Sequence, residues 1–343
     1  MKLLLVKLSS LGDVVHTFPA LTDAAAAVPG LTVDWAVEEA FAPVAALHPA
    51  VRHTIAVPLR RLRKHPLAAW RSGEADRVRA ALAQERYDLV IDAQGLMKSA
   101  LVARCAHGVR HGFDRASARE GLASLFYAQR HHVPETEHMA TRIRKLFAAA
   151  LGYGLEGRPE DSGLRPAPAA GAPYLVFLHG TTWGTKTWTR AGWRRLAVLA
   201  GEAGLKVRLF AHGALEQARA QAIAEGLPQV DLLPPQSLDT LAPLLQSAAG
   251  VVSVDTGLGH LAAAYGVPTV GLYGPTNPRL TGLFGERVAE LSATRTCAPC
   301  EKSRCRIDPG FGEGPPCLAD QPPEQVWAAL RGLAGSGAAV DKG

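Results

Sequence analysis

The residues best suited to chemistry lie in polar loops, each of which follows a short apolar run typical of a strand. One such loop follows residues 250–254 and contains Asp255, Thr256, Gly257, Leu258 and His260 at the start of a predicted helix. Free backbone amides at a helix N-terminus bind anions, and glycines let a phosphate approach the backbone closely. Asp255 could accept hydrogen bonds from sugar hydroxyls. The loop predicts a site for a phosphate-bearing sugar, although a buried histidine on a helix face explains His260 equally well.

A second loop follows residues 174–178 and combines two adjacent hydroxyls, Thr181 and Thr182, with the cation Lys186. These groups suit a pyrophosphate whose negative charge grows as it leaves. The loop is not a Walker motif, and a polar loop that caps a helix is the alternative. Glu216 begins the helix after residues 206–210, where an acidic residue could bind ribose hydroxyls. A first-turn glutamate favoured by the helix dipole explains Glu216 nearly as well.

A third loop, residues 7–17, places Ser10, Gly12 and Asp13 after the first apolar run. It lacks the G-x-G-x-x-G pattern that lets a backbone approach a dinucleotide, which argues against NAD or FAD in the first half. A carboxylate in this place could act as a general base toward an attacking sugar hydroxyl. A helix N-terminal residue that binds free amides explains Asp13 as well, so both roles stay open.

Charge is unevenly distributed along the chain. Residues 1–150 hold 20 Lys and Arg against 14 Asp and Glu, whereas the remainder holds 17 of each. The interval between Glu39 and Glu74 contains no acidic residue, and its basic residues are Arg52, Arg60, Arg61, Arg63, Lys64 and Arg71. We therefore expect the first half to meet a negatively charged partner, with a solvated basic face as the alternative.

Four of the five cysteines cluster near the C-terminus: Cys297, Cys300, Cys305 and Cys317. In a cytosolic protein such a cluster favours zinc over disulfides. The spacing matches no standard zinc finger, however. A reduced loop without metal is the preferred interpretation, and a structural metal site is left open.

These loops require a scaffold that brings strand ends together. Strand-like runs alternate with helical stretches along the whole chain, which is typical of βαβ units and parallel sheets. We expect a helix over residues 13–27, and strands at 3–6, 32–37, 54–57, 89–91, 174–178, 206–210, 250–254 and 269–273. Residues 154–173 are rich in Gly and Pro without periodicity, as in linkers between domains.

The sequence thus predicts an α/β protein with a first domain at 1–155, a linker at 156–172 and a second domain at 173–335. Loops at the carboxyl ends of the two sheets would line a cleft between them. Lys7 interrupts the first apolar run before any signal-peptide cleavage site, and no apolar run approaches the roughly 20 residues of a membrane-spanning helix. A cytoplasmic protein, free or peripheral to a membrane, is expected.

Longer motifs carry a resemblance to a known family. They are KLSSLGDVVHTFPAL at the start, DWAVEE at 34–39, DAQGLMKSA at 92–100, VSVDTGLGHLAAA at 252–264 and GLYGPTNP at 271–278. Over nearly the whole chain they resemble the lipopolysaccharide heptosyltransferases, glycosyltransferase family 9, and most of all the heptosyltransferase I branch. The resemblance implies the GT-B fold, two Rossmann-like domains that face a central cleft. It also implies inverting transfer of L-glycero-D-manno-heptose from ADP-heptose to the inner Kdo of Kdo2-lipid A, in lipopolysaccharide inner-core biosynthesis.

The resemblance further implies roles for individual residues. Asp13 would be the catalytic base, and Lys186 with helix-end amides would replace a divalent ion at the diphosphate, so no metal cofactor is expected. ADP-heptose would be bound by Thr181, Thr182, Lys186, Glu216, Asp255, Thr256, Gly257, Leu258 and His260. The acceptor would be bound by Ser10, Gly12, Arg60, Arg61, Arg63, Lys64, Lys98 and Arg119. A lipid A acceptor would place the enzyme at the cytoplasmic face of the inner membrane.

Two other hypotheses explain parts of the sequence. A nucleotide-sugar 2-epimerase would use a similar cleft, but it has no lipid acceptor and needs no basic surface. A non-catalytic protein that binds nucleic acid or an anionic membrane would leave Asp13, Lys186 and Asp255 unexplained. No aromatic stacking motif accompanies the arginines, so nucleic acid is not an expected partner.

Overall fold

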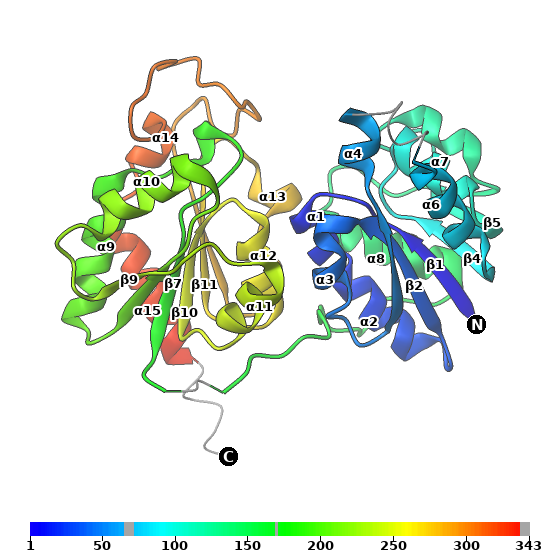
Figure 1. Cartoon of the computed structure of the whole chain (residues 1–343), viewed down its shortest axis with the longest axis horizontal. Helices are drawn as coiled ribbons and strands as arrows, with labels where there is room; N and C mark the ends of the chain where they lie inside the picture. The colour runs from blue at the N-terminus through cyan, green and yellow to red at the C-terminus, as the bar shows by residue number, and fades with distance from the viewer. Residues whose placement is uncertain (65–71, 169–170, 337–343) are drawn as a thin grey trace. The chain divides into compact units, whose positions relative to one another are not determined.

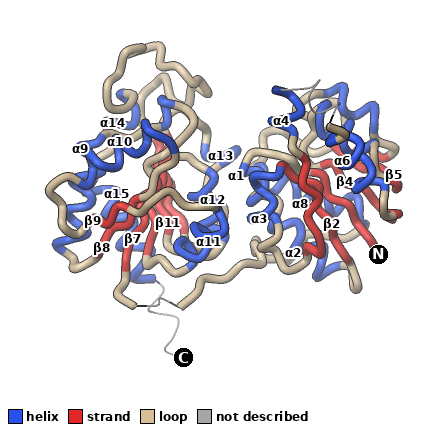
Figure 2. The backbone as a smooth tube through the Cα atoms, viewed as in Figure 1, coloured by secondary structure: helices blue, strands red, loops and turns tan. Residues whose placement is uncertain are grey.

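The computed structural model describes residues 1–64, 72–168 and 171–336 (Figure 1). The chain divides into two compact units, Met1–Leu164 and Arg165–Gly343. Each unit is an open sheet with helices on both faces, as the separation of strands and helices in Figure 2 shows. Arg71 of the basic interval lies outside the described residues, as does the side chain of Arg63.

The first unit contains a six-stranded sheet in the order β3-β2-β1-β4-β5-β6, in which every neighbouring pair is parallel. Its strands are β1 (Lys2–Val6), β2 (Thr32–Glu38), β3 (Val51–Val57), β4 (Arg86–Asp92), β5 (His107–Phe113) and β6 (Gln129–His131). Its described helices are α1 (Leu11–Val15), α2 (Phe18–Ala27), η1 (Glu39–Phe41), α3 (Ala42–Ala45), α4 (Leu59–Lys64), α6 (Glu74–Ala83), α7 (Met97–Arg104), η2 (Gly121–Phe126) and α8 (Met139–Leu151).

Strand β1 is apolar and buried from Leu3 to Val6, because helices cover both faces of the sheet. On one face, Leu4 and Val6 belong to a buried cluster with residues of α6 and α7. On the other face, Phe18 of α2 packs edge-on against Trp35 of β2, with ring centroids 6.1 Å apart. A central parallel strand covered in this way is expected to be a continuous hydrophobic run.

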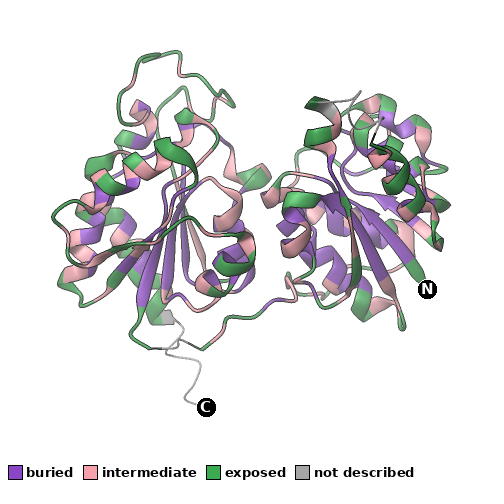
Figure 3. Ribbon diagram, in the orientation of Figure 1, coloured by how far each residue is buried: buried purple, intermediate pink, exposed green. Residues whose placement is uncertain are grey.

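The second unit also contains a six-stranded parallel sheet, in the order β12-β11-β10-β7-β8-β9. Its strands are β7 (Tyr174–Leu178), β8 (Lys206–Leu209), β9 (Val230–Leu232), β10 (Gly250–Val254), β11 (Thr269–Tyr273) and β12 (Val288–Ser292). Its described helices are η3 (Gly184–Lys186), α9 (Arg190–Glu202), α10 (Gly213–Ala224), α11 (Leu238–Gln246), α12 (Gly257–Ala264), α13 (Pro278–Thr281), α14 (Pro316–Ala319) and α15 (Pro323–Ser336). The central strands β7, β10 and β11 are buried along their whole length (Figure 3).

Both sheets have the same topology. Numbered within its own unit, each sheet has the strand order 3-2-1-4-5-6, which is that of the doubly wound nucleotide-binding fold. The winding reverses between β1 and β4 in the first unit and between β7 and β10 in the second. Ligands of such sheets bind outside the carboxyl ends of the strands at this switch point. The predicted α/β fold of two Rossmann-like domains is confirmed.

The elements differ from the prediction in two respects. The helix expected over 13–27 is two helices, α1 and α2, because Pro19 lies in the first turn of α2 and lacks the N–H that a helix interior requires. Strands β5, β6, β9 and β12 were not predicted. Their residues are mostly polar or partly exposed, so they lack the apolar signal of the central strands.

The first unit includes part of the segment rich in Gly and Pro. Arg144 of α8 donates hydrogen bonds to the backbone oxygens of Arg158 and Pro159, at 3.1 and 3.2 Å. Leu164, at the end of the same unit, is buried. The division between the units therefore falls after residues that are packed against the first unit.

The described helices are too short to span a membrane. The longest is α15 with 14 residues, followed by α8 and α9 with 13 each. A helix that crosses a bilayer needs roughly 20 apolar residues. Among the helices of the described segments, none is long and apolar enough for such a crossing.

Candidate active site

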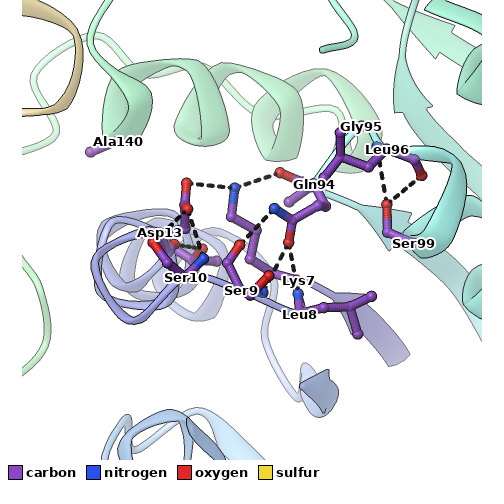
Figure 4. Close-up of polar contacts among 12 residues, drawn as sticks. Lys7, Leu8, Ser9, Ser10, Asp13, Gln94, Gly95, Leu96, Ser99 and Ala140 are labelled. Atoms are coloured by element: carbon purple, nitrogen blue, oxygen red, sulfur yellow. Dashed lines mark hydrogen bonds and ion pairs between the residues drawn. The ribbon is translucent and has the colours of Figure 1, made fainter. Parts of the chain in front are cut away.

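The first group of site residues surrounds Asp13, just beyond the carboxyl end of β1 (Figure 4). One oxygen of the Asp13 carboxylate accepts hydrogen bonds from the backbone N–H and the hydroxyl of Ser10, at 2.8 and 3.0 Å. The other oxygen lies 3.5 Å from Nζ of Lys7. The side chain of Asp13 is 20% exposed, whereas that of Lys7 is 1% exposed. Asp13 thus contacts solvent and, on its inner side, a buried cation.

These contacts keep Asp13 ionised. Burial alone would raise the pKa of Asp13, but the charge of Lys7 and the hydrogen bonds from Ser10 outweigh burial and hold the pKa below its usual value. Burial lowers the pKa of Lys7, while the charge of Asp13 opposes that shift. Nζ of Lys7 also donates a hydrogen bond to the backbone oxygen of Ala93, at 3.0 Å. An ionised carboxylate that solvent can reach is able to accept a proton.

Gln94, in the loop after β4, fixes the backbone that leads from β1 to Asp13 (Figure 4). Its side-chain oxygen accepts hydrogen bonds from the N–H groups of Leu8 and Ser9, at 2.9 and 3.1 Å. Its side-chain nitrogen donates to the backbone oxygen of Ser9, at 2.6 Å. The two loops of the first switch point are therefore joined by one amide side chain.

Two of the predicted acceptor-binding cations lie near Asp13. Nζ of Lys98, from the first turn of α7, donates to the hydroxyl of Ser9 at 3.1 Å. Arg119 is exposed, and its positive charge contributes to the lowered pKa of Asp13. Ser10 contacts Asp13 directly, and Gly12 is buried in α1. The first switch point thus gathers an ionised carboxylate and two cations.

The basic interval needs a correction, because part of its charge is neutralised within the protein. Arg61 forms ion pairs with Glu39 and Glu74, at 2.9 and 2.6 Å. These are the two acidic residues that bound the interval in the sequence. Arg52 forms an ion pair with Asp34 at 2.6 Å. Arg52 and Arg61 therefore have acidic partners in the folded unit, although the interval itself contains no acidic residue.

The other described cations of the interval are placed differently. Arg60 is exposed and lies over the ring of Phe41, with Cζ 5.4 Å from the ring centroid. Lys64 is exposed at the end of α4. The side chain of Arg63, which was also predicted to bind the acceptor, lies outside the described residues.

The second group of site residues lies at the switch point of the second unit. Nζ of Lys186, in η3 after β7, lies 2.7 Å from one oxygen of Asp255, which follows β10. Nε2 of His260, in α12, lies 3.7 Å from the other oxygen. The three side chains are between 6% and 17% exposed. The structure therefore brings together three residues that the sequence predicted for the donor site.

The Lys186–Asp255 pair was not predicted, because Lys186 was expected to bind the diphosphate and Asp255 the sugar hydroxyls. Burial alone would raise the pKa of Asp255, but the contact with His260 and the charge of Lys186 outweigh burial and hold the pKa well below its usual range. Nζ of Lys186 also lies 4.6 Å from the centroid of the Trp183 ring. The ammonium group is thus held in a fixed place by a carboxylate and an aromatic face.

The remaining donor residues lie on the same two loops. The hydroxyl of Thr181 donates to the backbone oxygen of Asp255 at 3.4 Å, and Thr182 is exposed. Thr256 precedes α12 as its N-cap residue, and Gly257 and Leu258 form its first turn, all three partly exposed. The amide of Gly259 donates to the backbone oxygen of Thr256 at 3.0 Å. The first amides of a helix have no acceptor within the helix, so an anion bound at this turn stays a prediction.

Gly259, in the first turn of α12, allows this helix to lie close to strand β10. A Cβ atom at this position would lie 2.4 Å from the side-chain oxygen of Ser253 in β10. The absence of a side chain therefore allows α12 to pack tightly on its own strand.

Glu216 lies in the first turn of α10, where its carboxylate accepts a hydrogen bond from the backbone N–H of His212 at 2.8 Å. A Cβ atom on Gly180 would lie 2.6 Å from the same carboxylate, so Glu216 reaches the loop that follows β7. The interpretation as a helix-end residue is therefore correct, and a contact with ribose stays a prediction.

The cysteine cluster lies beside the donor loops. Its four thiols line one pocket together with Thr185, Gly274 and Pro275, and all five cysteines of the chain are free. Burial raises the pKa of Cys317. Within the described residues, no group of three or more His, Cys, Asp or Glu side chains could hold a metal ion. The structure gives no support to the metal site that the spacing left open.

Sequence reasoning missed Lys7, Gln94 and Trp183. A signal existed for Lys7, because a lysine directly after a buried strand and six residues before a candidate base is unusual. Gln94 lay in a motif quoted only for its family resemblance. Trp183 directly precedes η3, and nothing in its spacing indicated a contact with Lys186.

Comparison with known proteins identifies what this site belongs to. Residues 76–310 match the model of glycosyltransferase family 9 (heptosyltransferase), which is more than half of the chain. Lipopolysaccharide heptosyltransferase 1 of Pseudomonas aeruginosa is 51% identical over 314 residues, which cover 90% of this chain and 88% of that protein. Lipopolysaccharide heptosyltransferase 1 of Escherichia coli K12 is 46% identical over 304 residues, which cover 86% and 94% of the two chains.

The chain is also similar to solved structures of a heptosyltransferase. The structure of E. coli heptosyltransferase WaaC with ADP matches with a TM-score of 0.81 at 45% identity, over 85% of this chain and 93% of that chain. WaaC with ADP-2-deoxy-2-fluoro heptose matches with a TM-score of 0.79 at 44% identity, over the same shares of the two chains. These matches decide against the epimerase and against the non-catalytic binding protein. The chain therefore belongs to glycosyltransferase family 9, the heptosyltransferases, and is an enzyme of lipopolysaccharide biosynthesis.

Proposed function

We propose that this enzyme transfers L-glycero-D-manno-heptose from ADP-heptose to the inner Kdo of Kdo2-lipid A, with inversion at the anomeric carbon. Relatives named lipopolysaccharide heptosyltransferase 1, and the WaaC structures with ADP and with an ADP-heptose analogue, support the proposal. The observation that carries it in this structure is the partly exposed carboxylate of Asp13, which Lys7 and Ser10 keep ionised.

In this proposal the second unit binds the donor. Lys186 and the free amides at the start of α12 present positive charge to the diphosphate, so the reaction uses no metal cofactor. Asp255 orients the heptose hydroxyls and Glu216 binds the ribose, while Thr181, Thr182, Thr256, Gly257, Leu258 and His260 line the same site. When the bond between the anomeric carbon and the phosphate oxygen breaks, negative charge grows on ADP. Positive groups fixed in advance stabilise that charge.

The first unit supplies the base and binds the acceptor. Asp13 accepts the proton of the Kdo hydroxyl as the hydroxyl oxygen forms a bond to the anomeric carbon, on the face opposite to the leaving ADP. The electron pair of the broken bond leaves with ADP, and Asp13 later returns its proton to water. A general base of this kind contributes roughly 10²- to 10⁴-fold to a rate.

The acceptor carries Kdo carboxylates and lipid A phosphates, which suit lysine and arginine side chains. Ser10, Gly12, Lys98 and Arg119 would contact its sugar part, close to Asp13. Arg60, Arg61, Arg63 and Lys64 would bind its anionic groups, and Arg61 would exchange its carboxylate partners to do so. A lipid-linked acceptor places the enzyme at the cytoplasmic face of the inner membrane.

The test is the release of ADP from ADP-heptose in the presence of deacylated, water-soluble Kdo2-lipid A. Release that depends on this acceptor and yields a heptosylated product of inverted configuration is expected. ADP-mannose at equal concentration serves as the comparison donor. Equal release with and without acceptor would contradict the transfer, and a product that keeps the donor configuration would contradict the role of Asp13.

A further inference from the structure

Two elements of the first unit carry large apolar side chains that face solvent. Helix α7 and η2 pack on each other through a small core that contains Ala100, Ala123 and Tyr127. Outside this core, Leu101 of α7 is 50% exposed, and Leu122 and Leu125 of η2 are 59% and 68% exposed. Side chains three residues apart in a 3₁₀ helix point the same way, so Leu122 and Leu125 extend together from η2. We call these three residues the leucine surface.

The chain around the leucine surface is strongly basic. Residues 97–130 contain six Lys and Arg and two Asp and Glu. Five of the six cations are exposed, namely Lys98, Arg104, Arg115, Arg119 and Arg130. Exposed apolar side chains with exposed cations close to them in the sequence complement a surface that is anionic at its headgroups and apolar beneath them.

Both acidic residues of this stretch are engaged within the protein. The carboxylate of Asp114 accepts a hydrogen bond from the backbone N–H of Ser117 at 2.8 Å and lies 3.0 Å from Nδ1 of His132. The carboxylate of Glu120 accepts a hydrogen bond from the backbone N–H of Met97 at 2.6 Å. Both carboxylates keep their negative charge, but six cations against two carboxylates leave this stretch with a net positive charge.

The same two elements lead to the candidate base. Lys98, in the first turn of α7, reaches Ser9 in the loop that carries Asp13. Arg119 lies two residues before η2, and its charge acts on Asp13. The two elements that expose the leucines therefore also carry, or closely follow, the cations near Asp13.

We propose that the leucine surface and the exposed cations around it dock this enzyme on an anionic lipid bilayer. Leu122 and Leu125 enter the boundary between headgroups and acyl chains, and the cations bind phosphate headgroups. Docking in this orientation presents a lipid-linked acceptor to Lys98, Arg119 and Asp13. The orientation toward the acceptor rests on the proposed function, whereas binding to the bilayer does not.

The test is sedimentation of the full chain with vesicles of phosphatidylglycerol and phosphatidylcholine, compared with vesicles of phosphatidylcholine alone. The wild type is expected to bind the anionic vesicles, and Leu122→Ser/Leu125→Ser is expected to weaken this binding by roughly 10-fold or more. Leu215→Ser is the matched control, because Leu215 is 82% exposed on α10 of the second unit. Arg104→Gln/Arg115→Gln is expected to weaken binding by roughly 5-fold per cation removed.

A second readout keeps the test independent of how well the serine variant folds. Leu125→Trp is expected to show fluorescence quenching by brominated lipid beyond that of the wild type, whereas Leu215→Trp is not. Unchanged vesicle binding by Leu122→Ser/Leu125→Ser, or equal quenching in the two tryptophan variants, would overturn the proposal. A wild type that ignores vesicles but forms a dimer that the serine variant disrupts would overturn it too, in favour of self-association.

Transfer to the deacylated, water-soluble acceptor separates this proposal from the proposed function. Leu122→Ser/Leu125→Ser is expected to retain transfer to that acceptor and to lose transfer to Kdo2-lipid A held in vesicles. A wild type that binds vesicles through the leucine surface but transfers no heptose would contradict the proposed function and leave the docking surface standing.

Discussion

At the scale of single residues, the site depends on how a buried cation and a partly exposed carboxylate are arranged. Lys7 is almost fully buried, and its ammonium group faces the carboxylate of Asp13. A buried cation beside a base keeps that base ionised, so it is ready to accept a proton over a wide pH range. In the proposed mechanism this makes Asp13 a weaker base, because a lowered pKa reduces its affinity for a proton.

Lys7→Met is expected to move the acidic limb of the pH–rate profile to higher pH. The pKa of Asp13 is lowered in the native enzyme, and activity is lost as the pH falls through that pKa. Without the charge of Lys7, less opposes the effect of burial, so the pKa of Asp13 rises from its native value. The measurement is the pH dependence of kcat/KM for transfer to deacylated acceptor.

Lys2→Met is the matched control, because the side chain of Lys2 is 48% exposed and pairs with Glu85. It should leave the profile unchanged. A Lys7→Met enzyme whose rate falls by one factor at every pH, with the acidic limb in place, would mean that Lys7 supports the fold rather than the ionisation of Asp13.

The sequence predicted most of these residues, because strand ends followed by polar, glycine-containing loops are visible in one dimension. It did not predict that Lys186 pairs with Asp255. The two residues are far apart in the sequence, and only the hydrogen-bonded neighbours β7 and β10 bring them together. The internal partners of Arg61 were missed for the same reason, since Glu39 and Glu74 approach it only in the folded unit.

At the scale of elements, one buried ion pair joins two helices of the first unit. Nε of Arg144 in α8 lies 2.6 Å from the carboxylate of Asp23 in α2, and both side chains are at most 6% exposed. The two helices pack on each other in the first unit, whose strand β1 leads to Asp13. Removal of Asp23 would leave the buried Arg144 with a longer contact to Glu160, at 3.4 Å, and with backbone oxygens as its remaining partners.

Asp23→Ala is therefore expected to lower the free energy of unfolding by about 3–5 kcal/mol. Urea denaturation followed by circular dichroism measures this change. Glu324→Ala is the control, since it removes the partner of Arg195 in a pair whose side chains are 46% and 59% exposed. If the two variants unfolded at the same urea concentration, the ion pair between α2 and α8 would not be a stabilising feature.

The elements themselves were predictable where their residues are apolar. The central strands β1, β7, β10 and β11 are buried runs that the sequence marked clearly. Strand β5, with the sequence HGVRHGF, is not an apolar run, because it contains His107, Arg110 and His111. Gly259 shows the limit at a single position, since only the packing of α12 on Ser253 explains why no side chain is tolerated there.

At the scale of the whole molecule, the account divides the reaction between two units of the same topology. In the proposed function, the switch point of the second unit binds the donor and that of the first unit transfers the proton. Variants in one unit should therefore change one function and leave the other intact.

Lys186→Met is expected to weaken ADP binding by roughly 10- to 100-fold, because a charged hydrogen-bond partner of the diphosphate is lost. Asp13→Asn is expected to bind ADP as the wild type does. Isothermal titration calorimetry on the full chain measures both, with Lys206→Met as a control lysine whose side chain is 51% exposed in the same unit. Equal loss of ADP affinity in the Asp13 and Lys186 variants would contradict the division of labour.

The most direct test of the account is the rate of heptose transfer from ADP-heptose to deacylated Kdo2-lipid A, measured for the wild type and Asp13→Asn under saturating substrates. The account predicts that the variant keeps its ADP affinity and loses roughly 10²- to 10⁴-fold in kcat, the contribution of a general base. A variant that transfers heptose at the wild-type rate would contradict the assignment of Asp13 as the base.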